Sequence, residues 1–202
     1  ERLATAGCDT GRDERFGEPR LTFRDPDRLD LALVEVLDDA RAPWTTPAVP
    51  AAVAIRGFHG VTLALADPAP TAELLTALLD YRERGAEGGL RRLDAPAGAA
   101  ARVVDLAAVS AGPARLGAGS VHHVAFSVAD RATQDAVRAR LIDAGFQVTP
   151  PIDRDYFHAI YFRTPGGVLF EVATDRPGFT VDEPAERLGG ALKLPRQHEH
   201  RR

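Results

Sequence analysis

The sequence predicts an α+β fold in which a strand, a helix and several further strands follow one another twice. Two internal repeats carry this prediction. The first repeat aligns residues 21–34 with residues 160–173 without a gap. Each copy reads as a β-hairpin, because a proline-containing turn separates two segments of alternating apolar residues. The second repeat aligns residues 55–67 with residues 119–130. It predicts the first strand of each of the two strand–helix–strand units.

Residues 1–48, before the first of these two units, resemble the end of a further unit of the same kind. Residues 1–48 contain a predicted hairpin, and the proline-rich stretch at residues 42–50 reads as a linker. The predicted strand at residues 55–67 leads into a helix at residues 71–81, because apolar residues recur at helical spacing. That stripe consists of Leu74, Leu75, Leu78 and Leu79.

The second copy has clearer helix boundaries. A strand is predicted at residues 121–128, and Asp130 is a suitable N-cap for a helix at residues 131–144. Gly145 follows at the position where a left-handed residue ends many helices. The hairpin at residues 160–173 then completes this copy.

These elements predict the domain organisation. Residues 1–48 form the C-terminal part of a preceding module plus a linker, and residues 49–178 form a C-terminal domain. Its two modules span about residues 53–112 and 119–178. Residues 179–202 are polar and contain prolines, so they read as a C-terminal extension.

Composition excludes several classes of protein. The 202 residues are 45% apolar and carry a formal net charge of −4, without the basic patch that a nucleic-acid-binding protein needs. No apolar run approaches the roughly 18 residues of a membrane span. The single cysteine, Cys8, and the lack of a signal-peptide pattern predict a cytoplasmic protein. Because methionine is missing even at position 1, we expect an initiator-bearing stretch upstream.

Three polar residues stand out in apolar strands. His122 and His123 lie within the predicted strand at residues 121–128, and Glu171 lies within an apolar run of the last hairpin. Neighbouring residues of a strand point to opposite faces, so His122 and His123 are expected to diverge. A buried carboxylate needs a cation or a metal. Imidazole and carboxylate on neighbouring strands are consistent with either a metal site or a simple His–Glu hydrogen bond.

Other candidate residues have simpler explanations. Cys8 lies in a loop and reads as an ordinary thiol. Asp105, an isolated carboxylate in an apolar strand, is expected to accept a structural hydrogen bond. His198 and His200 lie in the tail and are expected to be solvated. Nucleophile-elbow and phosphate-loop motifs are missing, which argues against hydrolases and nucleotide-binding proteins.

The repeats, together with residues 120–126 (SVHHVAF) and 165–174 (PGGVLFEVAT), resemble the vicinal-oxygen-chelate superfamily of glyoxalases, bleomycin-resistance proteins and dioxygenases. The resemblance implies tandem βαβββ modules that form open, cupped mixed β-sheets with flanking helices. Residues 149–167 and 175–183 are similar, more narrowly, to ring-cleaving dioxygenases of the hydroquinone type. Those proteins have four modules, so this chain resembles the end of module two followed by modules three and four.

The resemblance implies a metal site in the last module. Its metal-binding histidine stands five residues before the apolar residue that closes the first strand, and counting from Val128 gives His123. The same count from Leu65 gives Gly60, and Glu171 aligns with Ala32 in the earlier hairpin. Only the last module therefore keeps both ligands.

The third ligand is implied to lie outside this sequence. In the hydroquinone-type family it resembles a histidine of the first module, so the chain reads as an incomplete enzyme. His59 could replace Gly60 only through a one-residue register shift, which would turn the other side chains to the wrong face.

The resemblance further implies catalytic roles for His122, Arg154 and Tyr161. Ring opening requires a phenol to lose a proton, anionic intermediates to be stabilised and protons to be returned, which suits an imidazole, a guanidinium and a phenol. The implied function is a non-haem Fe(II)-dependent dioxygenase, with Mn(II) or another divalent metal as the alternative. Its partners would be an aromatic diol and O2, with neither nucleic acid nor membrane.

Two other functions share this fold. A glyoxalase-like metal-dependent lyase or thiol transferase takes ligands from two paired modules, so Gly60 and Ala32 argue against it unless a homodimer joins two last modules. A metal-free sequestering protein of the bleomycin-resistance kind has no need of His123 and Glu171 in apolar strands. Fold alone does not choose among the three.

Overall fold

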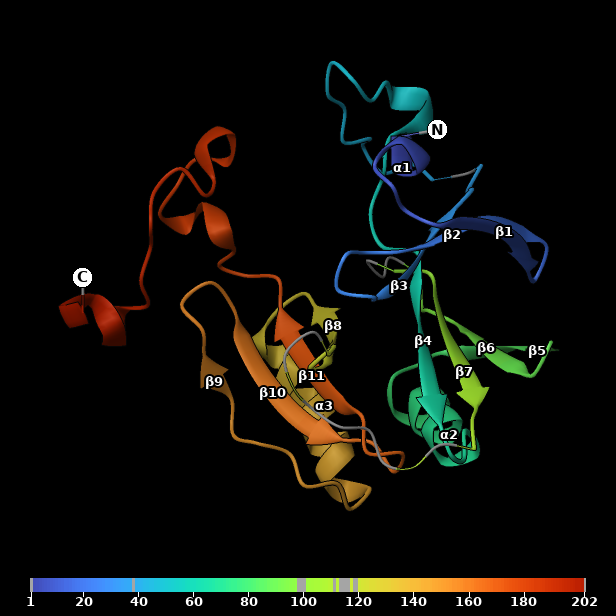
Figure 1. The fold of residues 1–202 in the computed structure, drawn as a ribbon. Helices are drawn as coiled ribbons and strands as arrows, with labels where there is room; N and C mark the ends of the chain where they lie inside the picture. The colour runs from blue at the N-terminus through green and yellow to red at the C-terminus, as the bar shows by residue number, and fades with distance from the viewer. Residues whose placement is uncertain are drawn as a thin grey trace. The chain divides into compact units, whose positions relative to one another are not determined.

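A computed structural model describes residues 2–37, 39–97, 101–110, 112, 117 and 120–201. It confirms the α+β fold, with three β-sheets and two longer helices (Figure 1). The chain divides into two compact units. Unit 1 comprises Glu1–Pro68 and Tyr81–Val121, and unit 2 comprises Ala69–Asp80 and His122–Arg202.

A three-stranded antiparallel sheet opens unit 1, after the short helix α1 (Arg2–Thr5). Its strands are β1 (Thr10–Arg15), β2 (Glu18–Arg24) and β3 (Asp30–Val34). The predicted hairpin at residues 21–34 is confirmed by the pairing of β2 with β3.

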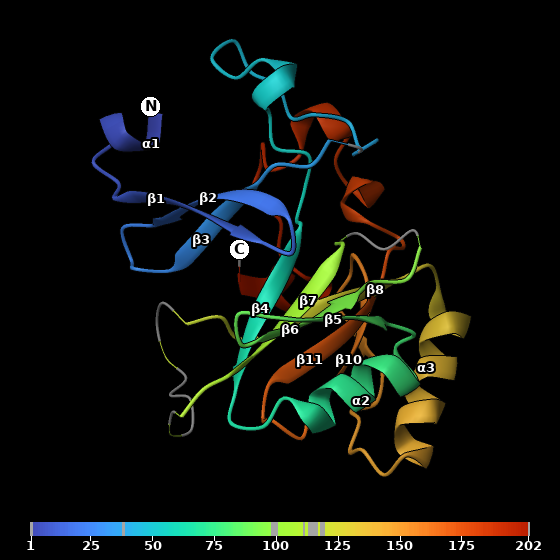
Figure 2. The ribbon, with the colours of Figure 1, turned by 90° about the vertical axis from the view of Figure 1, so that its right-hand side faces the viewer.

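A four-stranded sheet completes unit 1 (Figure 2). A short 3-10 helix (Ala51–Val53) precedes β4 (Gly60–Leu65), and the strand order is β4-β7-β6-β5, with β4 and β7 parallel. The opening strand is shorter than predicted, because pairing with β7 begins only at Gly60. The other strands are β5 (Arg82–Glu87), β6 (Leu90–Asp94) and β7 (Val103–Ala108). The core here includes the fully buried Leu93 and Leu106.

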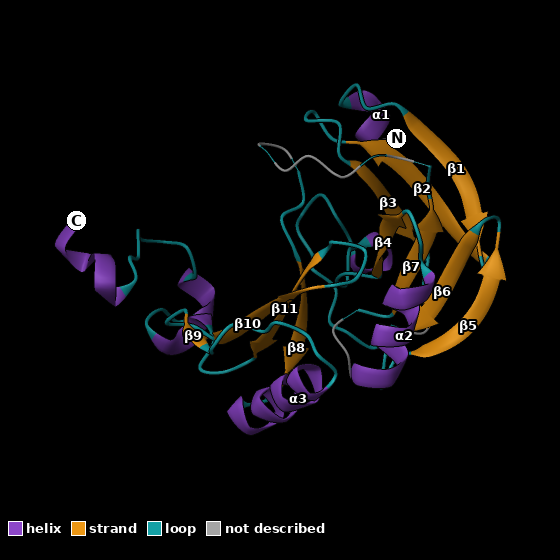
Figure 3. Ribbon diagram, turned by 90° about the horizontal axis from the view of Figure 1, so that it is seen from below, coloured by secondary structure: helices purple, strands orange, loops and turns teal. Residues whose placement is uncertain are grey.

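Unit 2 contains the second four-stranded sheet, in the order β8-β11-β10-β9. Strand β8 pairs in parallel with β11, just as β4 pairs in parallel with β7 in the four-stranded sheet of unit 1. Helix α3 (Arg131–Asp143) packs on one face of this sheet (Figure 3). The strands are β8 (Val124–Val128), β9 (Ile152–Asp153), β10 (His158–Arg163) and β11 (Leu169–Thr174).

Helix α3 begins and ends as predicted. The Asp130 side chain accepts a hydrogen bond from the backbone N–H of Thr133 at 2.8 Å, and Gly145 adopts a φ of 89°. The buried Gln134 side chain donates to the carbonyls of His158 and Val172, which ties the helix to β10 and β11. Capping and this cross-link together fix the helix over the sheet.

Helix α2 (Ala69–Leu78) follows β4 in sequence but belongs to unit 2, where it contacts α3. It begins two residues earlier than predicted, and Leu74 and Leu75 of the predicted stripe are buried. Short 3-10 helices (Phe179–Val181, Ala185–Arg187 and Arg196–Arg201) form the C-terminal extension. No helix in the described part of the chain combines the length and apolarity needed to cross a membrane.

The two aligned hairpins share one register. Leu21 pairs with Leu33 in the first hairpin, and the aligned Ile160 pairs with Val172 in the second. The turns also match, because the aligned Arg28 and Gly167 have φ values of 71° and 82°. The repeat in the sequence therefore corresponds to two hairpins with equivalent strand pairing.

Candidate metal centre

His123 and Glu171 meet on the sheet of unit 2. The His123 Nε2 lies 2.8 Å from the Glu171 Oε2. Parallel pairing of β11 with β8 sets Glu171 opposite Ala125, two residues after His123. The Glu171 side chain is 4% exposed and that of His123 is 36% exposed, so one edge of this pair faces solvent.

The two adjacent histidines do not diverge, and the expectation that they lie within a strand is wrong. Strand β8 begins at Val124, where pairing with Phe170 starts. Because His122 and His123 precede the paired segment, strand alternation does not apply to them. Their Nδ1 atoms lie 3.0 Å apart, and their rings are nearly perpendicular with centroids at 5.3 Å. His122 therefore contacts the candidate ligand directly.

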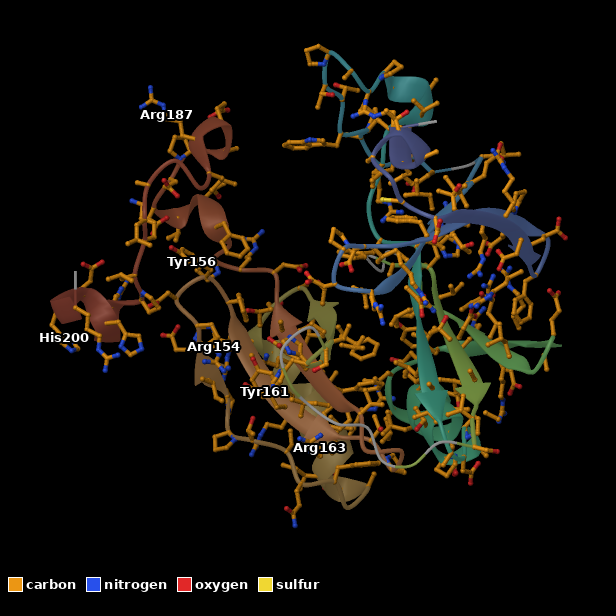
Figure 4. All side chains as sticks on the ribbon, viewed as in Figure 1. Arg154, Tyr156, Tyr161, Arg163, Arg187 and His200 are labelled. Atoms are coloured by element: carbon orange, nitrogen blue, oxygen red, sulfur yellow. The ribbon has the colours of Figure 1, made fainter. Side chains whose placement is uncertain are left out.

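Tyr161 and Arg154 complete the cluster. Tyr161 stands opposite Glu171 in the pairing of β10 with β11, and its ring centroid is 6.1 Å from that of His123. Arg154 Nη2 donates a long hydrogen bond of 3.4 Å to the Tyr161 hydroxyl, and Figure 4 shows the two side chains near each other. The structure thus brings together all five predicted site residues.

The surroundings of Tyr161 keep its phenol protonated. Burial raises the pKa of Tyr161 above its usual value, the hydrogen bond from Arg154 opposes this, and the Glu171 carboxylate raises the pKa further. A phenol with a raised pKa holds its proton at neutral pH, so it can donate a hydrogen bond or a proton.

The donor set fits part of a metal site. An imidazole nitrogen and a buried carboxylate oxygen are ligands that Fe(II), Mn(II) and Zn(II) all accept. Throughout the described residues, no group of three His, Cys, Asp or Glu side chains is arranged to hold a metal ion. A metal held by His123 and Glu171 would therefore need a third ligand from elsewhere.

Unit 1 contains an ionic cluster that sequence reasoning missed. Arg92 is 1% exposed and forms two hydrogen bonds to the Asp105 carboxylate, at 2.7 and 2.9 Å. The expectation that Asp105 accepts a structural hydrogen bond is confirmed. His59 contacts Glu18 at 3.1 Å. The available signal for this cluster was Asp105 itself, a lone carboxylate in an apolar strand that needs a partner.

The tyrosines give a prediction about alkaline pH. Burial raises the pKa of Tyr81 to about 12, and a hydrogen bond to Asp182 raises that of Tyr156. With Tyr161, all three tyrosines titrate above the unfolded value of about 10. The folded chain keeps protons that the unfolded chain loses, so the free energy of unfolding should fall as the pH rises above about 10.

Phenolate absorbance against pH measures this effect. At pH 10 we expect the native protein to show less than half of its full phenolate absorbance. In denaturant, all three tyrosines should titrate together in a single transition near pH 10. A native tyrosine that titrates at its ordinary pKa would contradict the assignment.

The sequence is similar to a known family and to several known proteins. The family model of the Glyoxalase/Bleomycin resistance protein/Dioxygenase superfamily matches residues 27–172. MhqO of Bacillus subtilis strain 168, named as a ring-cleaving dioxygenase, is 42% identical over 94% of this chain and 60% of its own length. The chlorohydroquinone/hydroquinone 1,2-dioxygenase of Sphingobium indicum is 37% identical over 92% of this chain and 60% of its own length.

A solved structure agrees with this similarity. The crystal structure of a Bacillus subtilis protein named as a dioxygenase superimposes with a TM-score of 0.92 and 40% identity. It covers 99% of this chain, which corresponds to 64% of that protein. The chain thus spans about three fifths to two thirds of the length of these relatives.

Proposed function

Because the chain belongs to the glyoxalase/bleomycin resistance protein/dioxygenase superfamily, we propose that it is the larger part of a ring-cleaving dioxygenase. The enzyme opens hydroquinone-like or related aromatic diols with O2 and depends on non-haem Fe(II). The observation that carries this proposal is the contact of His123 with the buried Glu171, beside Tyr161 and Arg154. The names of the relatives support the reaction class.

His123 and Glu171 would hold the iron, and Mn(II) is the alternative metal. A histidine outside this sequence would complete a set of two imidazoles and one carboxylate, a ligand set that Fe(II) oxygenases use. Bound there, Fe(II) supplies the redox chemistry that O2 requires and orients the diol. The contact between His122 and His123 fixes the ligand ring, as outer-shell partners of metal-bound histidines commonly do.

Three side chains would handle protons and charge. A metal-bound His123 would donate its Nδ1 proton to the Nδ1 of His122, so His122 would carry its own proton on Nε2 and would donate it from there. The Arg154 guanidinium stabilises negative charge on the substrate oxygen. Tyr161 holds its proton at the hydroxyl and returns it as the ring opens, since the raised pKa of its phenol keeps it protonated.

Oxygen uptake tests the proposal. The polypeptide is extended to the full length of its relatives, loaded anaerobically with Fe(II), and supplied with hydroquinone, catechol or no diol. We expect uptake that depends on hydroquinone. Bound metal without uptake on any diol would refute ring cleavage and favour a metal-dependent lyase or thiol transferase. Tight binding of an aromatic ligand without any metal would favour a sequestering protein.

Tyr161→Phe is expected to lower kcat by about a hundredfold or more, the usual size of a lost general acid. Metal affinity should stay within about twofold, because the phenol is not a ligand. Tyr156→Phe is the matched control, since Tyr156 donates to Asp182 in the C-terminal extension and contacts neither ligand. Steady-state oxygen uptake and metal titration of both variants measure the difference. Equal kcat values for the two variants would remove Tyr161 from the reaction.

A further inference from the structure

The ionic cluster in unit 1 is built around one buried guanidinium. Arg92 Nε and Nη2 both donate to Asp105, and Arg92 Nη1 donates to Glu18. The Arg92 side chain is 2% exposed and that of Asp105 is 5% exposed. The ring of Phe16 covers the guanidinium, whose Cζ atom lies 4.3 Å from the ring centroid. This cation is therefore enclosed by carboxylates and an aromatic face.

The carboxylates come from two sheets of unit 1. Asp105 belongs to β7 and Glu18 to β2. The Glu18 Oε1 also contacts His59 Nε2 at 3.1 Å, and Arg92 and His59 together lower the pKa of Glu18 against the opposing effect of burial. Arg92 thus joins an acidic group of one sheet to an acidic group of the other.

Strand register relates this cluster to the candidate metal centre. In unit 2, Glu171 lies opposite Ala125 on β8 and opposite Tyr161 on β10. In unit 1, Asp105 lies opposite Thr62 on β4 and opposite Arg92 on β6. Thr62 follows Gly60 by two residues, just as Ala125 follows His123.

The equivalence holds residue by residue. Asp105 occupies the place of Glu171, Arg92 that of Tyr161, Gly60 that of His123 and His59 that of His122. A histidine cannot be restored at Gly60 without a backbone shift, because a Cβ there would lie 2.4 Å from the Val103 carbonyl oxygen. The four-stranded sheet of unit 1 therefore has a carboxylate, Asp105, at the position of Glu171, but no imidazole at the position of His123.

We propose that the cluster in unit 1 is a second, blocked metal centre in which the Arg92 guanidinium takes the place of a divalent cation. A guanidinium is always charged and bonds two carboxylates in fixed geometry, so it neutralises Asp105 and Glu18 without an exchangeable ion. Removing it leaves the Asp105 and Glu18 carboxylates facing a vacated space, with His59 on the other oxygen of Glu18. Carboxylate oxygens, with water completing the coordination, suit Mn(II).

Manganese binding tests this proposal in the 202-residue chain. Every variant carries His123→Ala, which silences the centre in unit 2. Every variant also carries Arg15→Gln, because Arg15 Nη1 lies 3.6 Å from Asp105 and could replace Arg92. Arg92→Ala is compared with Arg91→Ala, the adjacent strand residue, which pairs with the exposed Glu83. Paramagnetic resonance of free Mn(II) measures the ions bound per chain.

We expect Arg92→Ala to bind one Mn(II) at least about tenfold more tightly than Arg91→Ala, because it exposes two carboxylates, which are ligands that Mn(II) accepts. Mn(II) should also raise the Tm of Arg92→Ala alone, because a ligand of the native state stabilises it. Adding Asp105→Asn to Arg92→Ala should abolish both effects.

A folded Arg92→Ala variant that binds no more Mn(II) than Arg91→Ala overturns the proposal. If Arg92→Ala unfolds, it is refolded with millimolar Mn(II), and recovery only with the metal supports the blocked centre. If it stays unfolded, Arg92→Gln, which keeps a neutral hydrogen-bonding side chain, is measured in the same way. Binding of Mn(II) by Arg92→Gln that Asp105→Asn abolishes supports the proposal, and no binding overturns it.

Discussion

Glu171→Gln is expected to weaken metal binding by at least about a hundredfold and to remove most ring-cleaving activity, because a direct ligand matters at least as much as an outer-shell partner. The amide has the size of the carboxylate, so the sheet should stay folded, but it lacks the negative charge that a divalent cation requires. Metal titration and oxygen uptake, both with the extended protein that supplies the third ligand, measure the two effects.

The control for this substitution is Glu83→Gln. Glu83 is an exposed glutamate on β5 that pairs with Arg91, and its loss should change neither metal affinity nor activity. His123→Ala should match Glu171→Gln, since each removes one ligand. Retained metal binding and activity in Glu171→Gln would mean that the contact of His123 with Glu171 is only a structural hydrogen bond.

Phe170→Ala is expected to lower the free energy of unfolding by about 3 to 5 kcal/mol, the usual cost of emptying a buried aromatic site. Phe170 is fully buried under α3 and contacts the rings of Phe126 and Phe162 edge to face, with centroids at 4.8 and 5.8 Å. The substitution leaves a cavity between the sheet and the helix. Urea unfolding at neutral pH, followed by circular dichroism, measures the loss.

Leu31→Ala provides a control within the same repeat. Leu31 aligns with Phe170 and has the same place in its hairpin, but it is 39% exposed. We expect a loss below about 1 kcal/mol, because the side chain is only partly removed from water. If both variants lost the same free energy of unfolding, the greater burial of Phe170 would not contribute to stability as expected.

Local pattern carried much of the fold. The gapless alignment of the two hairpins agrees with their shared strand register, because cross-strand pairing follows once the turn is set. Asp130 and Gly145 predict the ends of α3 for the same reason, since capping depends on residues adjacent in sequence. The positions of Glu171 and Tyr161 on paired strands follow directly from that register.

Where strands β8 and β4 begin depends on pairing with distant strands, which the local sequence pattern does not show. The sequence predicts His122 and His123 on opposite strand faces, but the ladder with β11 begins only at Val124, so their rings turn toward each other. Strand β4 likewise begins at Gly60 rather than at residue 55. The start of a strand depends on where its partner is available, and that partner lies more than 40 residues away.

The sequence by itself determined the repeated α+β architecture and singled out His122, His123 and Glu171, and its resemblance to a family added Arg154 and Tyr161. Only the tertiary structure decided how the two histidines meet and that Arg92 binds both Asp105 and Glu18, which is 74 residues away from it in the chain. Periodicity and capping act between near neighbours and can be read along the chain. A buried charge finds its partner only when distant strands pack together.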